Sequence, residues 1–277
     1  MSEPLQQAHW LMLLRQAAGI VLFGGFVVAF AAEFAFPRRR GAGPLGRLAH
    51  ARSNLLLWLA GIAVMSAVYG GSVMLLLNWL QLRGVGLLTM LALPAAVKGV
   101  LAFLALDIGD YLFHRLSHRV RWLWLLHAVH HSDAHVDVTT NLRQHPLHIV
   151  LAQFAKILVC AAFGVPVAVF LLHEVINIGV AHSHHAAVAW PRSIDRVFAW
   201  LLITPRMHWN HHSPEMARTN SNFGVIFSVW DRAFGTLTQP VADADPPTGL
   251  HALGEARWHS AWGMLATPWR ARRLPQL

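Results

Sequence analysis

Long apolar stretches constrain this chain more than any other feature of its sequence. A helix of about 20 apolar residues spans the hydrocarbon core of a bilayer, and such stretches occupy residues 17–36, 54–80 and 87–113. Only 13% of the residues are charged, about half the share found in soluble domains. The apolar stretches therefore predict an all-α, polytopic transmembrane helical bundle rather than a domain with a single water-facing surface.

The connections between apolar stretches predict how the helices follow one another. Residues 81–84 join the second and third stretches and are short enough to form a hairpin, and Pro94 weakens the start of the third. Two further apolar runs, 149–163 and 165–180, are separated by glycine and proline, and each is short for a full crossing. We expect these two runs to form either a re-entrant hairpin or two shorter tilted helices.

The arginines predict the orientation of the bundle. The formal net charge is +9, and arginines gather at 38–52 and 115–121, directly beside apolar stretches, as in cytoplasmic loops. Because such flanks explain the charge, a nucleic-acid partner is not expected. The pattern places the amino terminus outside and every histidine cluster on the cytoplasmic side. With twenty arginines and only two lysines, the composition hints at a bacterial gene, and we expect the bacterial inner membrane.

The two ends of the chain allow further predictions. The first apolar stretch could be a cleaved signal peptide ending near residues 29–31, but its length and the basic residues after it favour a helix that stays in the membrane. Residues 240–247 are rich in Asp, Ala and Pro, and tryptophans and arginines follow them. We therefore expect one membrane-embedded domain over 1–239, followed by a linker and an interfacial tail over 240–277.

Histidines are the second unusual feature of the sequence. Of the nineteen histidines, fifteen lie between residues 114 and 212. They form H-x-x-x-H at 114–118 and H-x-x-H-H at 127–131 and 208–212, and this spacing puts the rings on one face of a helix. One such pair is more often structural, but three motifs offer more imidazoles than one ion can bind. The histidines therefore predict a centre with two metal ions.

The type of ligand leaves the metal open, because imidazole suits zinc, copper, iron and nickel. Cys160 is the only cysteine, so the chain cannot build a Cys-ligated zinc site or an iron–sulfur cluster on its own. The residues around the histidines narrow the choice of metal, because they form motifs. The motifs are D-I-G-D-Y-L-F-H-R-L-S-H at 107–118, L-W-L-L-H-A-V-H-H-S at 123–132, R-Q-H-P-L at 143–147, T-P-R-M-H-W-N-H-H-S at 204–213, N-F-G at 222–224 and W-D-R-A-F-G-T at 230–236.

In order and approximate spacing, these motifs resemble those of the fatty acid hydroxylase and sterol desaturase superfamily, over residues 107–236. The resemblance implies a histidine-bound di-iron centre that uses dioxygen to hydroxylate or desaturate lipids. Motif by motif, it implies eight metal ligands. They are His114, His118, His127, His130, His131, His208, His211 and His212.

The resemblance is looser around residues 182–185. His185 stands six residues before Pro191, where the family often has H-x-N-x-x-x-P, and we take it as a ninth ligand although Ala187 replaces the asparagine. His182, one helical turn earlier, is a candidate tenth ligand. His184 points about 100° away from its neighbour and is the weaker candidate. The family's glutamate after H-P-L is here His148, so no role of that carboxylate carries over.

Three further residues are candidates for supporting the ligands. Asp110 lies one turn before His114, where it could accept a hydrogen bond from the outer N–H of a ligating ring, or instead pair with an arginine. His145 and His173 are also candidates, although His145 could equally be a simple loop histidine, and a residue like His173 on an apolar run is more often an interior structural histidine. Further carboxylates of the same kind are Asp107, Asp133 and Asp231.

The sequence thus predicts a membrane oxidoreductase that uses two iron ions and dioxygen to hydroxylate or desaturate an acyl chain, a sterol or an isoprenoid. No G-x-G-x-x-G motif is present, so we expect electrons from a separate ferredoxin-like or cytochrome donor. Zinc is a possible adventitious occupant. Two alternatives stay open, namely a zinc-dependent membrane hydrolase and a haem-binding electron carrier with axial histidines.

Overall fold

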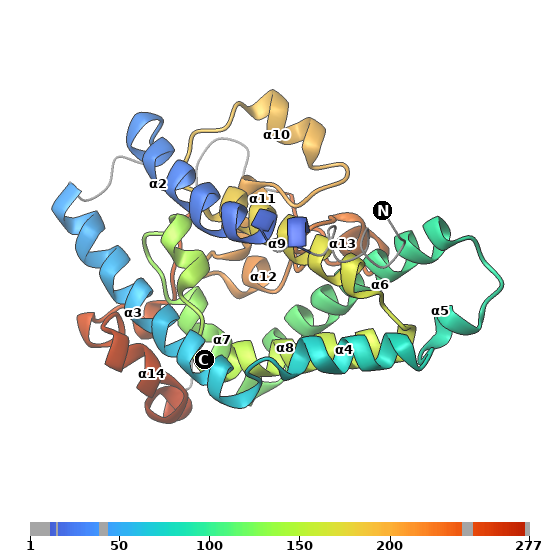
Figure 1. Ribbon diagram of the computed structural model, residues 1–277. Helices are drawn as coiled ribbons and strands as arrows, with labels where there is room; N and C mark the ends of the chain where they lie inside the picture. The colour runs from blue at the N-terminus through green and yellow to red at the C-terminus, as the bar shows by residue number, and fades with distance from the viewer. Residues whose placement is uncertain (1–11, 15, 39–43, 240–245, 275–277) are drawn as a thin grey trace.

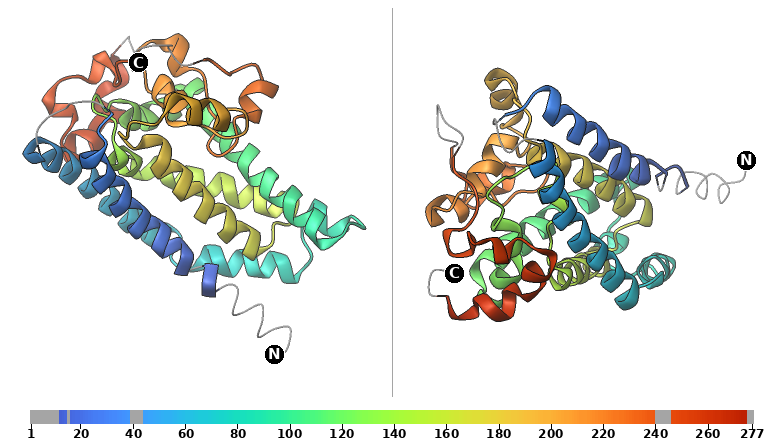
Figure 2. Two further views of the ribbon diagram at one scale, coloured as in Figure 1. Left: turned by 90° about the horizontal axis from the view of Figure 1, so that it is seen from above. Right: turned by 90° about the vertical axis from the view of Figure 1, so that its left-hand side faces the viewer.

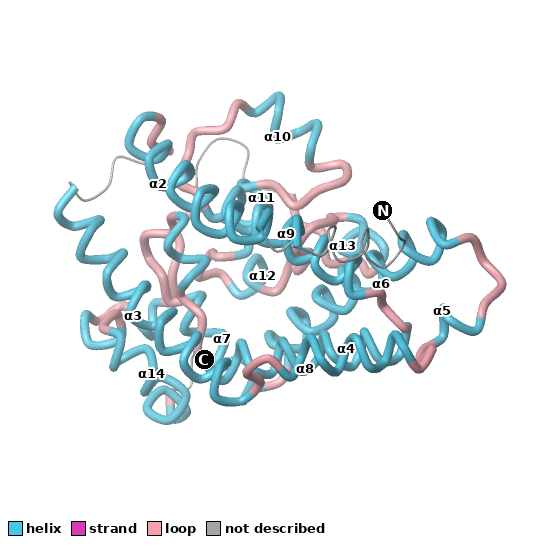
Figure 3. The backbone as a smooth tube through the Cα atoms, in the orientation of Figure 1, coloured by secondary structure: helices cyan, strands magenta, loops and turns pink. Residues whose placement is uncertain are grey.

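The chain folds into helices joined by loops. The computed structural model (Figure 1) describes residues 12–14, 16–38, 44–239 and 246–274. Within these ranges no β-strand occurs, and the only extended pairings are two isolated bridges (Figure 3). The prediction of an all-α fold is confirmed.

Long helices form the body of the molecule. The helices are η1 (Ile20–Gly25, a π-helical turn), α2 (Phe26–Ala35), α3 (Pro44–Val68), α4 (Ser72–Leu82), α6 (Ala95–Arg119), α8 (Pro146–Phe163) and α9 (Val167–His185). Five segments are long and apolar enough to cross a membrane, namely Met12–Ala35, Gly46–Val68, Ser72–Met90, Pro146–Phe163 and Val167–His185. The left view of Figure 2 shows most of these helices running side by side. The expected membrane bundle is therefore present. Helix α6 is not among these membrane-length segments, and it contains five charged residues.

Two of the predicted spans are divided differently from our expectation. The stretch at 54–80 is not one helix, because Gly70, with a positive φ of 50°, and Gly71 separate α3 from α4. The stretch at 87–113 is also interrupted: the short helix α5 (Leu87–Met90) ends before Pro94, and α6 starts after that proline. Both breaks occur at residues that disfavour a continuous helix.

The two runs that we expected to be short for a crossing are longer in the structure. Helix α8 starts at Pro146 and α9 ends at His185, which gives 18 and 19 residues. Gly164 ends α8 with a φ of 71°, and a Cβ there would lie 2.6 Å from the carbonyl oxygen of Val85. Glycine is therefore required at this turn, which lies directly against the connection between α4 and α5 at Val85, Gly86 and Thr89.

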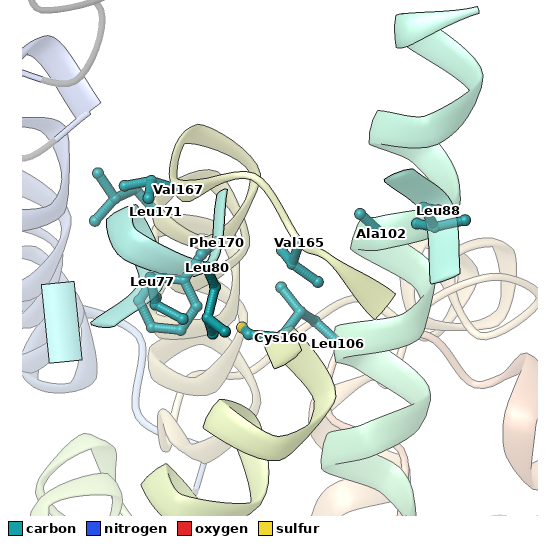
Figure 4. Packing of buried hydrophobic residues seen from close by; sticks show 10 residues of the cluster. All are labelled: Leu77, Leu80, Leu88, Ala102, Leu106, Cys160, Val165, Val167, Phe170 and Leu171. Atoms are coloured by element: carbon teal, nitrogen blue, oxygen red, sulfur yellow. The ribbon is translucent and has the colours of Figure 1, made fainter. Parts of the chain in front are cut away.

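Apolar side chains fill the end of the bundle where α8 turns into α9. Figure 4 shows this cluster, to which α4, α5, α6, α8 and α9 all contribute. Its members are Leu77, Leu80, Leu88, Ala102, Leu106, Cys160, Val165, Val167, Phe170 and Leu171. Among these ten residues the only sulfur atom is that of Cys160, which is buried among aliphatic groups.

The other end of the bundle is covered by a cap, which we define as α7, η2 and all elements after α9. These elements are α7 (Arg121–His131), η2 (Val138–Leu142), α10 (Arg192–Phe198), α11 (Pro205–His211), α12 (Met216–Thr219), α13 (Val229–Ala233), η3 (His251–Leu253), η4 (Ala256–Trp258), α14 (Ala261–Arg270) and η5 (Ala271–Arg273). Most of the expected linker, at 240–245, lies outside the described residues. Trp258 is buried against Trp124 of α7, whereas Trp262 and Trp269 are exposed.

One buried carboxylate ties the first helix to the cap. Glu33, near the end of α2, is fully buried and forms an ion pair with Arg47 of α3. Its Oε1 also accepts hydrogen bonds from the backbone N–H groups of Val138 (2.7 Å) and Ala187 (2.8 Å). Four separate segments therefore meet at one side chain, which fixes the bundle against the cap.

Candidate metal centre

Four helices bring their histidines together where the bundle meets the cap. The carboxyl-terminal turns of α6 and α9 run into this region, and α7 and α11 lie across it. Helix α11 begins with Thr204, whose hydroxyl accepts a hydrogen bond from the backbone N–H of Met207, followed by Pro205 at the first helical position. This is a common helix start, and it directs His208, His211 and the following His212 inwards.

The histidines form two groups, each compact enough to hold a metal ion. Within each group, one nitrogen from every ring lies within 4.8 Å of the others. The first group is His114, His118, His127, His131 and His211, and the second group is His130, His185, His208 and His212. All eight histidines implied by the motifs and the predicted ninth, His185, are thus brought together.

The distances within the groups show that the Nε2 atoms converge. In the first group, Nε2 of His114 lies 3.1 Å from Nε2 of His127 and 3.1 Å from Nε2 of His211. In the second group, Nε2 of His208 lies 2.9 Å from that of His185 and 3.1 Å from that of His212. The groups adjoin, because the rings of His131 and His212 stack with centroids 4.5 Å apart.

Burial keeps the rings of the cap in the neutral form that binds metal. Burial, with smaller contributions from neighbouring rings, holds the pKa well below the usual value for six histidines of the cap. They are His127, His130, His131, His208, His211 and His212. A neutral imidazole has a free lone pair, so the local environment favours the state that a ligand needs.

The residues fit a pair of metal ions. Both ring nitrogens of His118 and of His131 are buried and have no hydrogen-bond partner among the described residues, and the same holds for Nδ1 of His127, His208 and His212. Leaving such atoms unpaired costs about 1–3 kcal/mol each. Metal ions bound between the converging nitrogens would remove part of this cost, and nine imidazoles exceed what one ion can bind.

Backbone carbonyls, rather than carboxylates, contact the outer nitrogens of three of the rings. Nδ1 of His114 lies 2.8 Å from the carbonyl oxygen of Phe223, and Nδ1 of His211 lies 2.6 Å from that of Ser221. Nδ1 of His185 lies 2.8 Å from the carbonyl oxygen of Ala181. An Nδ1–H donated to a carbonyl leaves the Nε2 lone pair for the metal.

Three of the supporting residues expected from the sequence lie elsewhere. Asp110 accepts a hydrogen bond from Asn177 at 2.8 Å and pairs with Lys156 at 3.3 Å, not with a ligating ring. His145 caps α8 through Leu147 and contacts Leu265. The structure therefore gives His145 a structural role. His173 lies beside Asp110, with its Nε2 3.9 Å from Oδ2 of that aspartate.

His182 lies outside both groups. Its Nδ1 is 3.1 Å from the Asn141 amide, its Nε2 is 3.2 Å from the carbonyl oxygen of Leu22, and its ring contacts Phe26. This face of α9 is covered by the first helix, which local spacing cannot reveal. The proposed ligand set therefore omits His182.

Two more histidines stack against the groups. His148, which replaces the family's glutamate, stacks on His127 with centroids 4.6 Å apart, and His184 stacks on His208 at 3.9 Å. Nε2 of His148 also lies 3.0 Å from the Ser117 hydroxyl. Neither ring belongs to either group.

The loop that contains N-F-G owes its shape to Asp231. The carboxylate of Asp231 accepts hydrogen bonds from the backbone N–H groups of Phe223 and Gly224, both at 2.8 Å. The carbonyls that orient His114 and His211 belong to this same loop. We singled out Asp231 as a carboxylate that might contact a ligand directly, but its action through the loop was missed. The available signal was the closeness of the two motifs, since Asp231 stands only eight residues after Phe223.

We expect Asp231→Asn to weaken the first group selectively. An amide NH₂ would face a backbone N–H, which leaves a buried donor unsatisfied and loosens the loop at a cost of about 1–3 kcal/mol. Outer partners of this kind change metal affinity about 10- to 100-fold. Elemental analysis of purified protein should therefore show metal content falling from about two ions per chain towards one. Asp195→Asn, at a buried aspartate of α10, is the matched control, and unchanged metal content in Asp231→Asn would contradict the role of the loop.

A cavity of about 250 Å³ opens beside the two groups. His114, His127, His130, His185 and His208 line one part of it. Phe113, Ile149, Ala152, Ala181 and Val225 make much of the remaining wall apolar, and Asp110, Lys156 and Asn177 add polar groups. The cavity therefore offers an apolar molecule a place next to the histidines, between the bundle and the cap.

The comparisons with known proteins agree with this geometry. The fatty acid hydroxylase family model matches residues 99–236, which contain all nine histidines of the two groups. Over 188 residues the chain is 31% identical to alkylglycerol monooxygenase of Xenopus tropicalis, covering 63% of this chain and 40% of that protein. Over 162 residues it is 31% identical to ornithine lipid hydroxylase OlsE of Rhizobium tropici, covering 57% and 46%.

A third relative is more distant. Over 160 residues the chain is 28% identical to cholesterol 25-hydroxylase of Mus musculus, covering 56% of this chain and 50% of that protein. The chain thus spans half or less of the length of these curated relatives. No solved structure matches it. Because the family model coincides with the residues that build the histidine groups, the chain belongs to the fatty acid hydroxylase family.

Proposed function

We propose that this chain is a membrane oxidoreductase that uses two iron ions and dioxygen to hydroxylate a C–H bond of a lipid. One observation carries the proposal: nine imidazoles converge in two groups at one end of membrane-length helices, and five of them border a largely apolar cavity. The names of the relatives support hydroxylation over desaturation, since they act on alkylglycerol, ornithine lipid and cholesterol as monooxygenases or hydroxylases. They also favour this reading over a hydrolase or an electron carrier.

In this proposal the protein binds the metal ions and the lipid, orients the ligating rings, and shields the site from water. Two irons, one held by each histidine group, would supply the chemistry that activates dioxygen. Phe113, Ile149 and Val225 would hold an acyl, sterol or isoprenoid segment next to the rings and keep water away from it. Carbonyls of the N-F-G loop would keep His114 and His211 in the tautomer that leaves Nε2 free. Electrons would come from a separate ferredoxin-like or cytochrome donor.

Lipid profiling tests this function directly. Membranes from cells that express the chain under oxygen should contain a lipid heavier by one oxygen atom, and this lipid should be missing when the chain carries His208→Ala. Mass spectrometry of total lipid extracts gives the comparison. Identical lipid profiles in both strains would contradict the proposed function.

The same proposal includes an orientation, with the cap in the cytoplasm. Arg38 and Arg47 lie at the cap end of the bundle, where Arg38 stacks over Trp209 and Arg47 pairs with Glu33. Arginine-rich flanks favour the cytoplasmic side. In a Cys160→Ala background, a cysteine at Glu255 of the cap should resist an impermeant thiol reagent in intact cells, whereas one at Arg83, at the far end, should react. Labelling at position 255 from outside would show that the cap faces the outside and would contradict the proposed orientation.

A further inference from the structure

A cluster of charged side chains lies inside the bundle, beyond the histidine groups. Lys156 of α8 pairs with Asp110 of α6 at 3.3 Å and with Glu174 of α9 at 2.5 Å. Asn177 of α9 donates to Asp110 at 2.8 Å, and the fully buried His173 lies 3.5 Å from Glu174. Three helices thus place two carboxylates and one ammonium group among apolar residues.

Holding the helices together does not explain this cluster. Burying ions costs several kcal/mol each, and a buried ion pair is often no more stabilising than apolar residues of similar size. The helices also pack closely without it, since a Cβ added to Gly109 of α6 would lie 2.8 Å from Val159 of α8. Ionisable groups among membrane helices usually mark a functional site.

The cluster faces the same cavity as the histidines. Asp110, Lys156 and Asn177 line it together with His114 and His185. Asp110 precedes His114 by one turn of α6, a rise of about 6 Å, and Asn177 precedes His185 by about two turns of α9, or about 12 Å. The polar groups therefore form the floor of the cavity, a short distance into the bundle from the rings.

The floor offers unused hydrogen-bond acceptors. The contacts of Asp110 with Asn177 and Lys156 all fall on Oδ2, and no contact among the described residues falls on Oδ1. His184 also lines the cavity, is 2% exposed, and its Nδ1 has no partner among the described residues. Glu174 lies outside the cavity lining and pairs with Lys156, so the ammonium group is already neutralised and the free Oδ1 of Asp110 favours a ligand that donates a hydrogen bond.

We infer that Asp110, Asn177 and Lys156 form a subsite for a hydroxyl group of the lipid substrate. A hydroxyl donates to the free Oδ1 of Asp110 and accepts from Lys156 or from the Asn177 amide. The apolar remainder of the molecule then extends along Ile149 and Ala152 towards the rings. This inference rests on the proposed function for the identity of the ligand as substrate, and it assigns the substrate class: a lipid with a hydroxyl group several bonds from the carbon beside the histidines.

Equilibrium binding of two matched probes tests the subsite. Calorimetry on purified metal-loaded protein in one detergent would compare dodecan-1-ol with dodecane. We expect the alcohol to bind at least about tenfold more tightly, because a hydrogen bond to a charged group is worth about 1.5–3 kcal/mol. Asp110→Asn and Asn177→Ala should each reduce this preference several-fold while dodecane binding and metal content stay unchanged. Asp195→Asn, at a buried aspartate of α10 that does not line the cavity, is the matched control.

The outcomes separate the subsite from the proposed function. Equal binding of alcohol and alkane in the wild-type protein, or an undiminished preference in both variants, would overturn the subsite even if a lipid is hydroxylated. A preference for the alcohol that is lost in the variants supports the subsite even if no hydroxylated lipid is found. The binding measurement needs no turnover, so one failure does not mimic the other.

Discussion

Replacing His131 with alanine should remove bound metal and activity together. Both ring nitrogens of His131 are buried without a partner among the described residues, and its ring lies between the groups, near His211 (centroids 4.6 Å apart) and stacked on His212. Loss of a ligand exceeds the roughly 10- to 100-fold effect of an outer partner, so activity should fall by more than about a hundredfold. Elemental analysis beside an activity assay on the same preparation gives both readouts.

His145→Ala is the matched control for His131→Ala. His145 is equally buried, but it contacts Leu147 and Leu265 rather than either group, so its loss should leave about two ions per chain.

Protein overproduced without added iron should contain zinc instead and be inactive, because zinc binds more tightly than ferrous iron in the usual order. Active wild-type protein without any transition metal would refute the two-ion centre.

The second large effect concerns oxygen. With a reductant, a one-electron donor protein and labelled dioxygen, the hydroxylated lipid should contain one labelled oxygen atom, while the second atom leaves as water. Omitting any of these three additions should abolish the product, because the C–H bond supplies only part of the electrons that reduce dioxygen. Mass spectrometry of the product measures the label, and a desaturated product would carry none.

Variants separate loss of chemistry from loss of fold in this experiment. His114→Ala, His130→Ala and His208→Ala should abolish labelled product. Their helix content, followed by circular dichroism, should stay close to that of the wild type. The membrane-length helices form because their backbone groups must pair internally in an apolar environment, and this does not depend on the histidines. Full turnover in strictly anaerobic membranes would defeat the proposed reaction.

The sequence predicted which histidines come together better than it predicted their arrangement. Spacing of three and four residues puts His127, His130 and His131 on adjoining faces of α7, and this local rule was enough to select them. The same rule made His182 a candidate tenth ligand, but the structure places its ring outside both groups. Its environment is decided by the packing of the first helix against α9, and that contact joins residues 160 positions apart. Likewise, the assignment of His130 to one group and His131 to the other depends on tertiary packing.

The fold shows the same division between local and distant causes. The apolar stretches predicted an all-α bundle, and the glycines at 70 and 71 and Pro94 mark where the helices break. The end of α9 was predicted too early, since polar histidines continue the helix to His185. Those histidines lie in a buried region of other imidazoles, so a hydropathy pattern that scores them as polar places the boundary too soon.

The contacts of Glu33 also bear on the order of biosynthesis. Chains are made and folded from the amino terminus, and the ion-pair partner Arg47 emerges only 14 residues after this carboxylate. Val138 and Ala187 follow 105 and 154 residues after it. A nascent hairpin of α2 and α3 can thus neutralise the buried charge at once, whereas the final backbone contacts await synthesis of α9. The first two helices can therefore pair in the membrane before the part of the protein that carries the histidines is synthesised.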